Sequence, residues 1–465
     1  MVSYPSPASS SALPEYVAAS KPNPLENRAP WYKAIAPTYA GIFLWFAFWD
    51  QIAKNGQLSV SGLGLALLGV VAAAAICHFL FYLIPGLLGQ RTGLPLYVVG
   101  TSTFGTTGGL IMPGLLMGLL QFGWLGVNTY FSAKALAGSD SSPLFYALCV
   151  LWGAGAAFVG LKGIQYVAKV ATFLPLIPLA VLLLGLFKFG PSAASYAAES
   201  PAAGAATSAP MLALLGMISY IVGFFATAGA AGVDIASSGR DRNDVSLGGL
   251  VGILLAIVFT AGIALLIVAG ARAQNLDVTS VGAEANGMVA TDNLQAAFPG
   301  IAKAIMLGLA LASFPGACFS SLIAANSFKT TMPRVNSFLS VGLGALVSIL
   351  LAVTGWAANL PSVFGIIGAS FGPIVGAMCA DYLLAGNRWA GPRAGFNVAG
   401  WVAWAVGFLV GIMPNLSVWT DGAVPSIPAA PVMAFLVGFL VYFALAKAGL
   451  EGKVLPYEPA ERQAA

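Results

Sequence analysis

The stretch GFFATAGAAG at residues 223–232 decides the fold, because it places three glycines inside an apolar block long enough to cross a membrane. A second stretch, APTYAGIF at residues 36–43, brings Pro37 and Gly41 into the first apolar block of the chain. Glycine and proline weaken a helix, and irregular backbone at membrane depth survives only where it lines a cavity. Interrupted helices at matching places in two halves of a chain are typical of inverted-repeat membrane carriers.

The composition supports a membrane location for the rest of the chain. Of 465 residues, 58% are hydrophobic and 8% are charged. The 36 charged side chains compare with roughly 115 in a soluble chain of this length. This deficit excludes an ordinary soluble protein, and a net charge of +4 excludes a nucleic-acid binder. The sequence therefore predicts an all-α polytopic membrane protein that has the lipid bilayer as a partner and no nucleic acid.

The apolar blocks predict twelve transmembrane helices. Their approximate bounds are 34–54, 60–86, 106–134, 143–162, 166–188, 210–233, 246–271, 300–327, 336–356, 361–386, 394–413 and 427–449. We expect polar cytoplasmic tails at 1–33 and 450–465 around one transporter-like domain at 34–449. Within it, the predicted inverted repeats cover about 34–188 and 210–386, and two extra helices lie within 394–449.

The basic residues predict the orientation of the chain. If both termini are cytoplasmic, fifteen of the twenty Lys and Arg residues lie in cytoplasmic segments, as the positive-inside rule requires. We therefore expect a multi-pass protein of the plasma (inner) membrane. The four cysteines lie apart in apolar blocks, there is a single histidine, and the carboxylates are not clustered, so we expect no metal, no cofactor and no enzymatic activity.

Four side chains are candidates for a binding site between the breaks. Trp124 and Asn128 lie four residues apart and therefore share one face of the third helix. A large π surface beside a primary amide suits a planar heterocycle that forms hydrogen bonds. Phe224 and Phe225 of the sixth helix could form the opposing aromatic wall. The alternative is that Asn128 only bonds a neighbouring helix and that the aromatic side chains fill the core.

Asp234 and His78, and Asp50 near the outer end of the first helix, are candidates for coupling ion movement to transport, although Asp50 could equally snorkel to the interface. Asp234 ends the sixth helix and could gate or carry a proton, or cap backbone groups instead. His78 lies inside the second helix, where it could relay protons or be a neutral core residue. Asp381 near the end of the tenth helix is expected to pair with Arg388.

Several motifs together resemble those of the nucleobase–cation symporter-1 family, the group of cytosine permeases and of hydantoin, allantoin and purine carriers. They are RTGLPLYVV at 91–99, which continues through STFG at 102–105 to GWLGVNT at 123–129, FAT at 225–227 followed by Asp234, and FGPIVG at 371–376 followed by ADY at 380–382. Their order and spacing fit across nearly the whole chain.

This resemblance implies a LeuT-like fold: a five-plus-five inverted repeat with discontinuous helices 1 and 6, followed by two C-terminal helices. By position, Trp124 matches the family's stacking tryptophan and Asn128 an amide that bonds the substrate ring. Phe225 stands where a second stacking residue occurs, and Ser321 matches a further polar contact. The first-helix contact is expected between Thr38 and Phe43, with Gly41 among its candidates.

The resemblance also places a candidate cation site between the first and eighth helices. Its residues are Thr38, Gly41, Ala312 and Ser313, with Asp234 and His78 as further coupling candidates. The two hydroxyl positions that sodium-coupled members use align here with Pro315 and Gly316. The co-transported cation is therefore left open between H⁺ and Na⁺.

Together these features predict a symporter that imports a nucleobase such as cytosine or a purine, or a related planar heterocycle, by alternating access. One alternative is a carrier of another small solute, such as a thiamine-like vitamin or an amino acid. Another alternative, from a different class, is a channel or a non-transporting membrane receptor.

Overall fold

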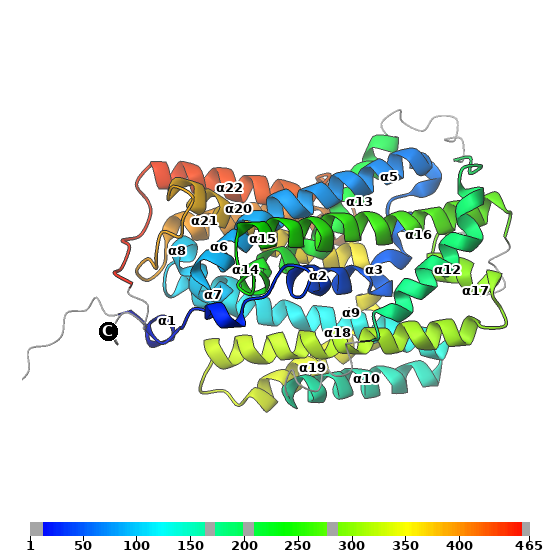
Figure 1. The fold of residues 1–465 in the computed structure, drawn as a ribbon, viewed down its shortest axis with the longest axis horizontal. Coiled ribbons are helices and arrows are strands. Elements are labelled where there is room, and N and C mark those ends of the chain that lie inside the picture. The colour runs from blue at the N-terminus through cyan, green and yellow to red at the C-terminus, as the bar shows by residue number, and fades with distance from the viewer. Residues whose placement is uncertain (1–12, 163–172, 199–208, 277–286, 458–465) are drawn as a thin grey trace, which may run out of the picture.

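The computed structural model of the protein describes residues 13–162, 173–198, 209–276 and 287–457. Within these ranges, ten helices are long and apolar enough to cross a membrane. The chain is therefore a multi-pass membrane protein. Most helices run roughly parallel to the long axis of the molecule, and the first and last described segments of the chain lie together at one end of it (Figure 1). The Tyr457 hydroxyl lies 3.5 Å from the Ser20 carbonyl oxygen, which places both ends on the same side.

The first half of the chain contains five spans. The first is divided into α2 (Ile35–Phe43), α3 (Phe46–Asp50) and α4 (Ile52–Asn55). The second comprises α5 (Leu58–Ile76), the π-helical turn η2 (Cys77–Tyr82) and α6 (Leu83–Thr92). After the short helices α7 (Leu96–Val99) and α8 (Thr101–Phe104), the remaining spans are η3 (Leu110–Leu115) with α9 (Leu116–Ala137), α10 (Pro143–Lys162) and α12 (Leu176–Ala193). The expected start of the fifth span, from residue 166, lies outside the described residues.

The second half repeats this arrangement. The sixth span is α13 (Ala209–Ala230) with α14 (Gly232–Ala236), and the seventh is α15 (Arg242–Gly249), η4 (Leu250–Leu255) and α16 (Ala256–Ala273). The short helix α17 (Ala290–Ala297) precedes α18 (Ala302–Thr331), α19 (Ser337–Val353) and α20 (Leu360–Leu384). The two additional helices are α21 (Val398–Trp419) and α22 (Ala430–Lys447).

The helix contacts show the inverted repeat. The first span packs on the seventh through α2 and η4, and the sixth packs on the second through α14 and α6. Likewise α9 packs on α19, and α18 packs on α10. Each of these pairs becomes the other when the first five spans are exchanged for the second five. The expected fold, with two discontinuous helices and two C-terminal helices, is therefore confirmed.

The break in the first span lies beyond Pro37 and Gly41, whereas the break in the sixth span lies between Gly229 and Gly232. The first span leaves the helix at Leu44 and Trp45, where Trp45 has an extended backbone with φ −62° and ψ 120°. Pro37 instead occupies the first turn of α2, where an amide N–H has no intrahelical acceptor and its absence costs little. The sixth span breaks at Ala231, between α13 and α14.

Gly223 does not interrupt α13; it lets α13 approach α20 closely. A Cβ at Gly223 would lie 2.6 Å from the Phe364 carbonyl oxygen, closer than a real contact permits. The small side chain therefore serves helix packing, as small residues commonly do between transmembrane helices.

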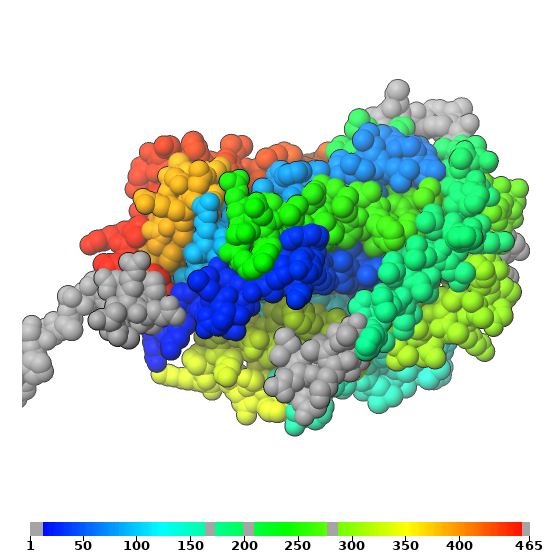
Figure 2. Space-filling model, viewed as in Figure 1, coloured from blue at the N-terminus to red at the C-terminus, as the bar shows by residue number. Residues whose placement is uncertain are grey.

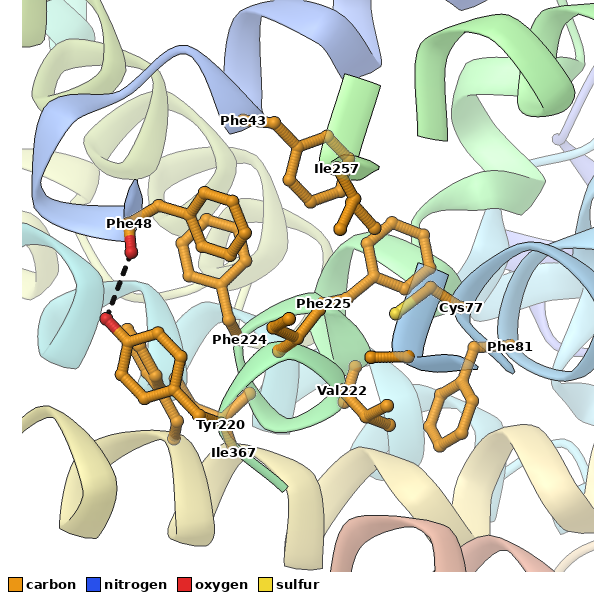
Figure 3. Close-up of a cluster of buried hydrophobic side chains, with 14 of the residues drawn as sticks. Phe43, Phe48, Cys77, Phe81, Tyr220, Val222, Phe224, Phe225, Ile257 and Ile367 are labelled. Atoms are coloured by element: carbon orange, nitrogen blue, oxygen red, sulfur yellow. Dashed lines mark hydrogen bonds between the residues drawn. The ribbon is translucent and has the colours of Figure 1, made fainter. Parts of the chain in front are cut away.

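Each broken helix uses a tyrosine of the other to satisfy its backbone. The Tyr220 hydroxyl of α13 donates to the Phe48 carbonyl at 3.1 Å, beside the break in the first span (Figure 3). The Tyr39 hydroxyl of α2 donates to the Ala228 carbonyl at 3.0 Å, beside the break in the sixth span. The Trp49 indole N–H also donates to the Leu44 carbonyl at 3.1 Å. Because a membrane interior offers no water to free carbonyl groups, these bonds make the two breaks possible.

Candidate functional site

Four aromatic side chains from four different spans meet beside the break in the first span. We call this group, formed by Trp45, Trp124, Phe224 and Phe364, the aromatic cluster. The Trp124 ring lies edge-on to Phe224 at 5.1 Å and is tilted by 32° to Phe364 at 5.5 Å between centroids. Trp45 meets Trp124 edge-on at 6.0 Å and stacks loosely on Phe224 at 6.3 Å. Trp124 and Trp45 are only partly buried, so part of each ring faces open space.

A hydrogen bond orients the Trp124 ring. Its indole N–H donates to the Thr227 hydroxyl of α13 at 3.2 Å. Thr227 is itself buried one turn beyond Phe224, so α13 contributes both an aromatic contact and a polar anchor. Since the two groups lie on different halves of the repeat, this bond joins the third span to the sixth next to both breaks.

Two glycines near the cluster in the chain, Gly41 four residues before Trp45 and Gly123 next to Trp124, leave room for a side chain. A Cβ added at Gly41 would meet no atom within 4 Å, and the same is true at Gly123, next to Trp124. Thr38, one turn before Gly41, is exposed, although its hydroxyl donates to the Ala34 carbonyl at 2.7 Å. In the space-filling view, α2 is visible at the surface between α15–α16 and α18 (Figure 2).

Phe224, and not Phe225, is the ring that meets Trp124. Phe225 is fully buried on the other side of α13, where it stacks on Phe43 at 5.8 Å and is tilted to Tyr39 at 5.9 Å (Figure 3). Adjacent residues of a helix point in directions about 100° apart, so only one of the two can face α9. The expected pairing of Trp124 with Phe225 differs from this arrangement for that reason.

Asn128 lies one turn beyond Trp124 in a buried polar group between α9, α10 and α18. Its amide N–H donates to the Ser313 carbonyl at 3.0 Å, and its amide oxygen accepts from the Trp152 indole at 3.1 Å and from the Ser132 hydroxyl at 3.3 Å. Its second N–H lies close to open space, because a Cβ at the exposed Gly316 would be 3.7 Å from this nitrogen. Asn128 therefore joins three helices and retains one donor at the edge of the site.

The two eighth-span candidates for a cation site, Ser313 and Ala312, point in different directions from α18. Ser313 is buried, donates to backbone carbonyls of its own helix at 2.9 Å, and lies 3.1 Å from the Ser132 hydroxyl of α9. Its hydroxyl thus lies between α18 and α9. Ala312, its neighbour, is partly exposed. Among the described residues, no group of three or more His, Cys, Asp or Glu side chains could hold a metal ion.

Ser321 lies away from the aromatic cluster. Its hydroxyl donates to the Ala317 carbonyl at 3.2 Å, and a Cβ at Gly160 of α10 would come within 2.7 Å of the Ser321 Cβ. It is therefore packed against α10.

Asp234 caps a helix start. A side-chain oxygen of Asp234 accepts from the Leu96 amide N–H at 2.9 Å, at the first residue of α7. The neighbouring Arg240 pairs instead with Asp244 at 2.8 Å. Asp234 therefore connects α14 to α7, at the end of the molecule where the chain ends lie.

His78 is buried in η2, where it is stacked on Tyr82 at 6.0 Å and lies edge-on to Phe79 at 4.6 Å. Its Nδ1 atom is buried without a hydrogen-bond partner. The residue sits where η2 and the seventh span pack together, since a Cβ at Gly249 would be 2.7 Å from this nitrogen.

Asp381 pairs with Arg393 and not with the expected Arg388. The Arg393 guanidinium lies 2.8 Å from the Asp381 carboxylate and 2.7 Å from that of Glu451, and both Arg393 and Asp381 are buried. Arg388 instead donates to the Ala385 carbonyl at its own helix end. The loop after α20 turns Arg393 back toward Asp381, which sequence distance alone does not reveal.

Three residues of the site were not among the sequence candidates: Trp45, Thr227 and Phe364. Trp45 lies two residues beyond the segment expected to contact a ligand, and its indole Nε1 is buried without a hydrogen-bond partner. Thr227 stands in the FAT motif, but its bond to Trp124 depends on how α9 and α13 meet. Phe364 lies near the start of α20, before the FGPIVG motif at 371–376, where the sequence carries no signal beyond its apolar character.

No protein-family model and no curated protein sequence matches the chain. Solved structures do match. Mhp1 in an inward-facing conformation superimposes with a TM-score of 0.70 at 19% identity, covering 98% of both chains. A second structure of Mhp1, described as a nucleobase-cation-symport-1 family transporter, has a closed conformation with bromovinylhydantoin bound. It superimposes with a TM-score of 0.63 at 18% identity, covering 92% of this chain and 94% of Mhp1. A Na⁺-coupled sialic acid symporter in a substrate-bound, outward-open state superimposes with a TM-score of 0.58 at 16% identity, covering 95% of this chain and 93% of the symporter chain. These similarities establish the fold.

Proposed function

We propose that the protein is a secondary transporter of the nucleobase–cation symporter-1 type. It carries a small planar nitrogen heterocycle, such as a nucleobase or a hydantoin, together with a cation. It acts as a carrier and not as an enzyme, and it works by alternating access in the plasma (inner) membrane with both termini in the cytoplasm. Mhp1, which shares the fold, binds a hydantoin derivative, and that observation favours a heterocycle over an amino acid or a vitamin.

The observation that carries this proposal is the position of Trp124. Its ring is partly exposed beside the break in the first span, anchored by Thr227 and flanked by Phe224. An aromatic face held at fixed orientation next to unwound backbone suits a flat ring, which gains stacking energy from the face and hydrogen bonds from nearby polar groups. In this proposal the substrate stacks on Trp124, Phe224 supplies the second aromatic contact, and the remaining N–H of Asn128 bonds the ring edge.

Gly41 belongs to the same proposed site, since it lies four residues before Trp45 and leaves room for a side chain. Phe225 and Ser321 hold the helices of the proposed site in place. Phe225 packs α13 on α2, and Ser321 packs α18 on α10. The cation is H⁺ or Na⁺. Thr38, Ala312 and Ser313 remain the candidates for a sodium position, and Asp234 and His78 for a proton.

The test is uptake into proteoliposomes of radiolabelled cytosine, uracil, hypoxanthine, adenine and hydantoin. Each compound is measured under an inward sodium gradient and, separately, under an inward proton gradient. We expect saturable uptake of at least one compound, driven by one of the two gradients. No uptake of any ring compound under either gradient would refute the proposal.

Trp124→Ala then tests the site. Loss of one stacked ring weakens binding by about 1–3 kcal/mol, which corresponds to roughly fivefold to one hundredfold weaker affinity. Trp419→Ala is the matched control, because this indole is exposed at the end of α21, far along the chain from the cluster. If Trp124→Ala transports as well as the control, the stacking role is wrong.

A further inference from the structure

The Trp45 side chain has an unused hydrogen-bond donor at the centre of the site. Its indole Nε1 is buried and has no hydrogen-bond partner. Buried donors in proteins are nearly always paired, and tryptophan N–H groups in particular find an acceptor when they are buried. An unpaired donor of this kind destabilises the structure in which it occurs, and a ligand that supplies an acceptor removes that cost.

The acceptors close to the break in the chain already receive other donors. The Leu44 carbonyl, directly before Trp45, accepts from the Trp49 indole at 3.1 Å. The Phe48 carbonyl accepts from the Tyr220 hydroxyl at 3.1 Å. The Thr227 hydroxyl accepts from the Trp124 indole at 3.2 Å. The neighbouring polar groups are thus arranged in donor–acceptor pairs, and the Trp45 N–H is left over.

The position of Trp45 allows its side chain to reorient when a ligand binds. The residue lies between α2 and α3 with an extended backbone, so it belongs to neither helix and its side chain can turn without moving one. Its ring is only partly buried and meets the Trp124 ring at 6.0 Å. A flat molecule bound beside Trp124 is therefore close to the Trp45 indole.

We propose that the Trp45 indole N–H donates a hydrogen bond to a carbonyl oxygen on the edge of the transported heterocycle. This inference rests on the proposed function and makes it more specific, because it names the substrate class as ring compounds that carry a lactam or imide carbonyl. Trp45 is then a specificity-determining residue. A hydrogen-bonding site rejects an analogue that lacks the matching group, because the protein donor is left unpaired in that complex.

The chemical alternative is an acceptor nitrogen within the ring. Hypoxanthine and adenine separate the two, since they share N3 and the imidazole acceptor nitrogen of the purine ring. They differ at C6, which carries a carbonyl next to an N1–H donor in hypoxanthine and an amino group next to an acceptor N1 in adenine. A donor that reads the carbonyl distinguishes them, and a donor that reads a ring nitrogen common to both does not.

The experiment measures binding to the purified full-length protein by isothermal titration calorimetry. The compounds are hydantoin, uracil, hypoxanthine and adenine. The wild type is compared with Trp45→Phe, which keeps an aromatic ring and removes the N–H, and with Trp419→Phe, which makes the same chemical change at an exposed position on α21. Near-identical thermal unfolding of the three proteins shows that the variants are folded.

We expect Trp45→Phe to weaken binding of the carbonyl compounds by about fivefold to tenfold, the range of a neutral hydrogen bond. Adenine binding is already weak in the wild type and changes less than twofold. Trp419→Phe binds every compound as the wild type does.

Two results overturn the inference while leaving the proposed function intact. One is a wild type that binds ring compounds while Trp45→Phe binds the carbonyl compounds equally well. The other is an equal loss of affinity for hypoxanthine and adenine, which assigns Trp45 either a packing role or a hydrogen bond to a ring nitrogen that both purines share. A wild type that binds no compound of the panel refutes the proposed function, and the inference fails with it.

Discussion

Gly41 offers a test of the site in which stability and transport are expected to change in opposite directions. The residue lies within α2, and a Cβ there would meet no atom within 4 Å, so a methyl group fits without moving a neighbour. Replacing a glycine in a helix by a better helix former stabilises the helix by roughly 0.5–1 kcal/mol. Gly41→Ala and Gly41→Leu should therefore unfold at the same temperature as the wild type or at a higher one.

Transport should fall in the same variants, because Gly41 belongs to the proposed substrate site and a larger side chain would fill the space beside it. We expect Gly41→Ala to raise the substrate concentration needed for half-maximal uptake, and Gly41→Leu, with three more carbon atoms, to abolish saturable uptake. The assays are thermal unfolding of the purified protein and proteoliposome uptake of the best substrate from the panel of ring compounds.

Gly64→Leu is the matched control. Gly64 lies inside α5 and is exposed, and a Cβ there would likewise meet no atom within 4 Å, so the helix gain is the same and the site is untouched. Uptake by Gly41→Leu equal to that by Gly64→Leu would show that the space beside α2 is not on the substrate path. A lower unfolding temperature for Gly41→Ala would show that the steric argument is wrong.

Two further predictions concern ionised groups away from the cluster. Asp381→Asn leaves the buried Arg393 with one fewer carboxylate, so we expect the free energy of unfolding to fall by an amount near the lower end of the about 3–5 kcal/mol typical of a broken buried pair. Thermal unfolding measures this loss. Asp140→Asn, at the surface, is the control and should change stability little. Asp50→Ala removes the carboxylate that accepts a hydrogen bond from the Thr291 amide at 2.7 Å, near the start of α17. A cap of this kind stabilises a helix by about 1 kcal/mol, so amide hydrogen exchange should become faster in residues 290–297. Unchanged exchange there would contradict the capping role.

The membrane class, the number of spans and the repeat were predictable from the sequence because they depend on local chemistry. Apolar blocks about 20 residues long must cross a bilayer, and few other folds can use a chain with 8% charged residues. Trp124 was also selected as a candidate from the sequence, since a large aromatic side chain beside an amide at helical spacing is unusual in an apolar span. Glycine and proline indicated which two helices are broken.

The exact places of the breaks were decided by tertiary contacts. A transmembrane helix can open only where other side chains satisfy the carbonyl groups that it frees. Tyr220 and Trp49 do so in the first span at positions that glycine content does not mark, and Tyr39 does so beside the glycines of the sixth span. The partner of Asp381 was likewise decided by the turn after α20, which brings Arg393 back to it.

The same distinction applies to the site. The sequence by itself determined that aromatic and amide side chains of the third and sixth helices are available, because helical periodicity places Trp124 and Asn128 on one face. Only the tertiary structure decided that Phe224 and not Phe225 faces Trp124, and that Trp45 joins them from the break. The physical reason is that periodicity sets the relative directions of side chains within one helix, whereas the rotation of each helix against its neighbours follows from the packing of all of them together.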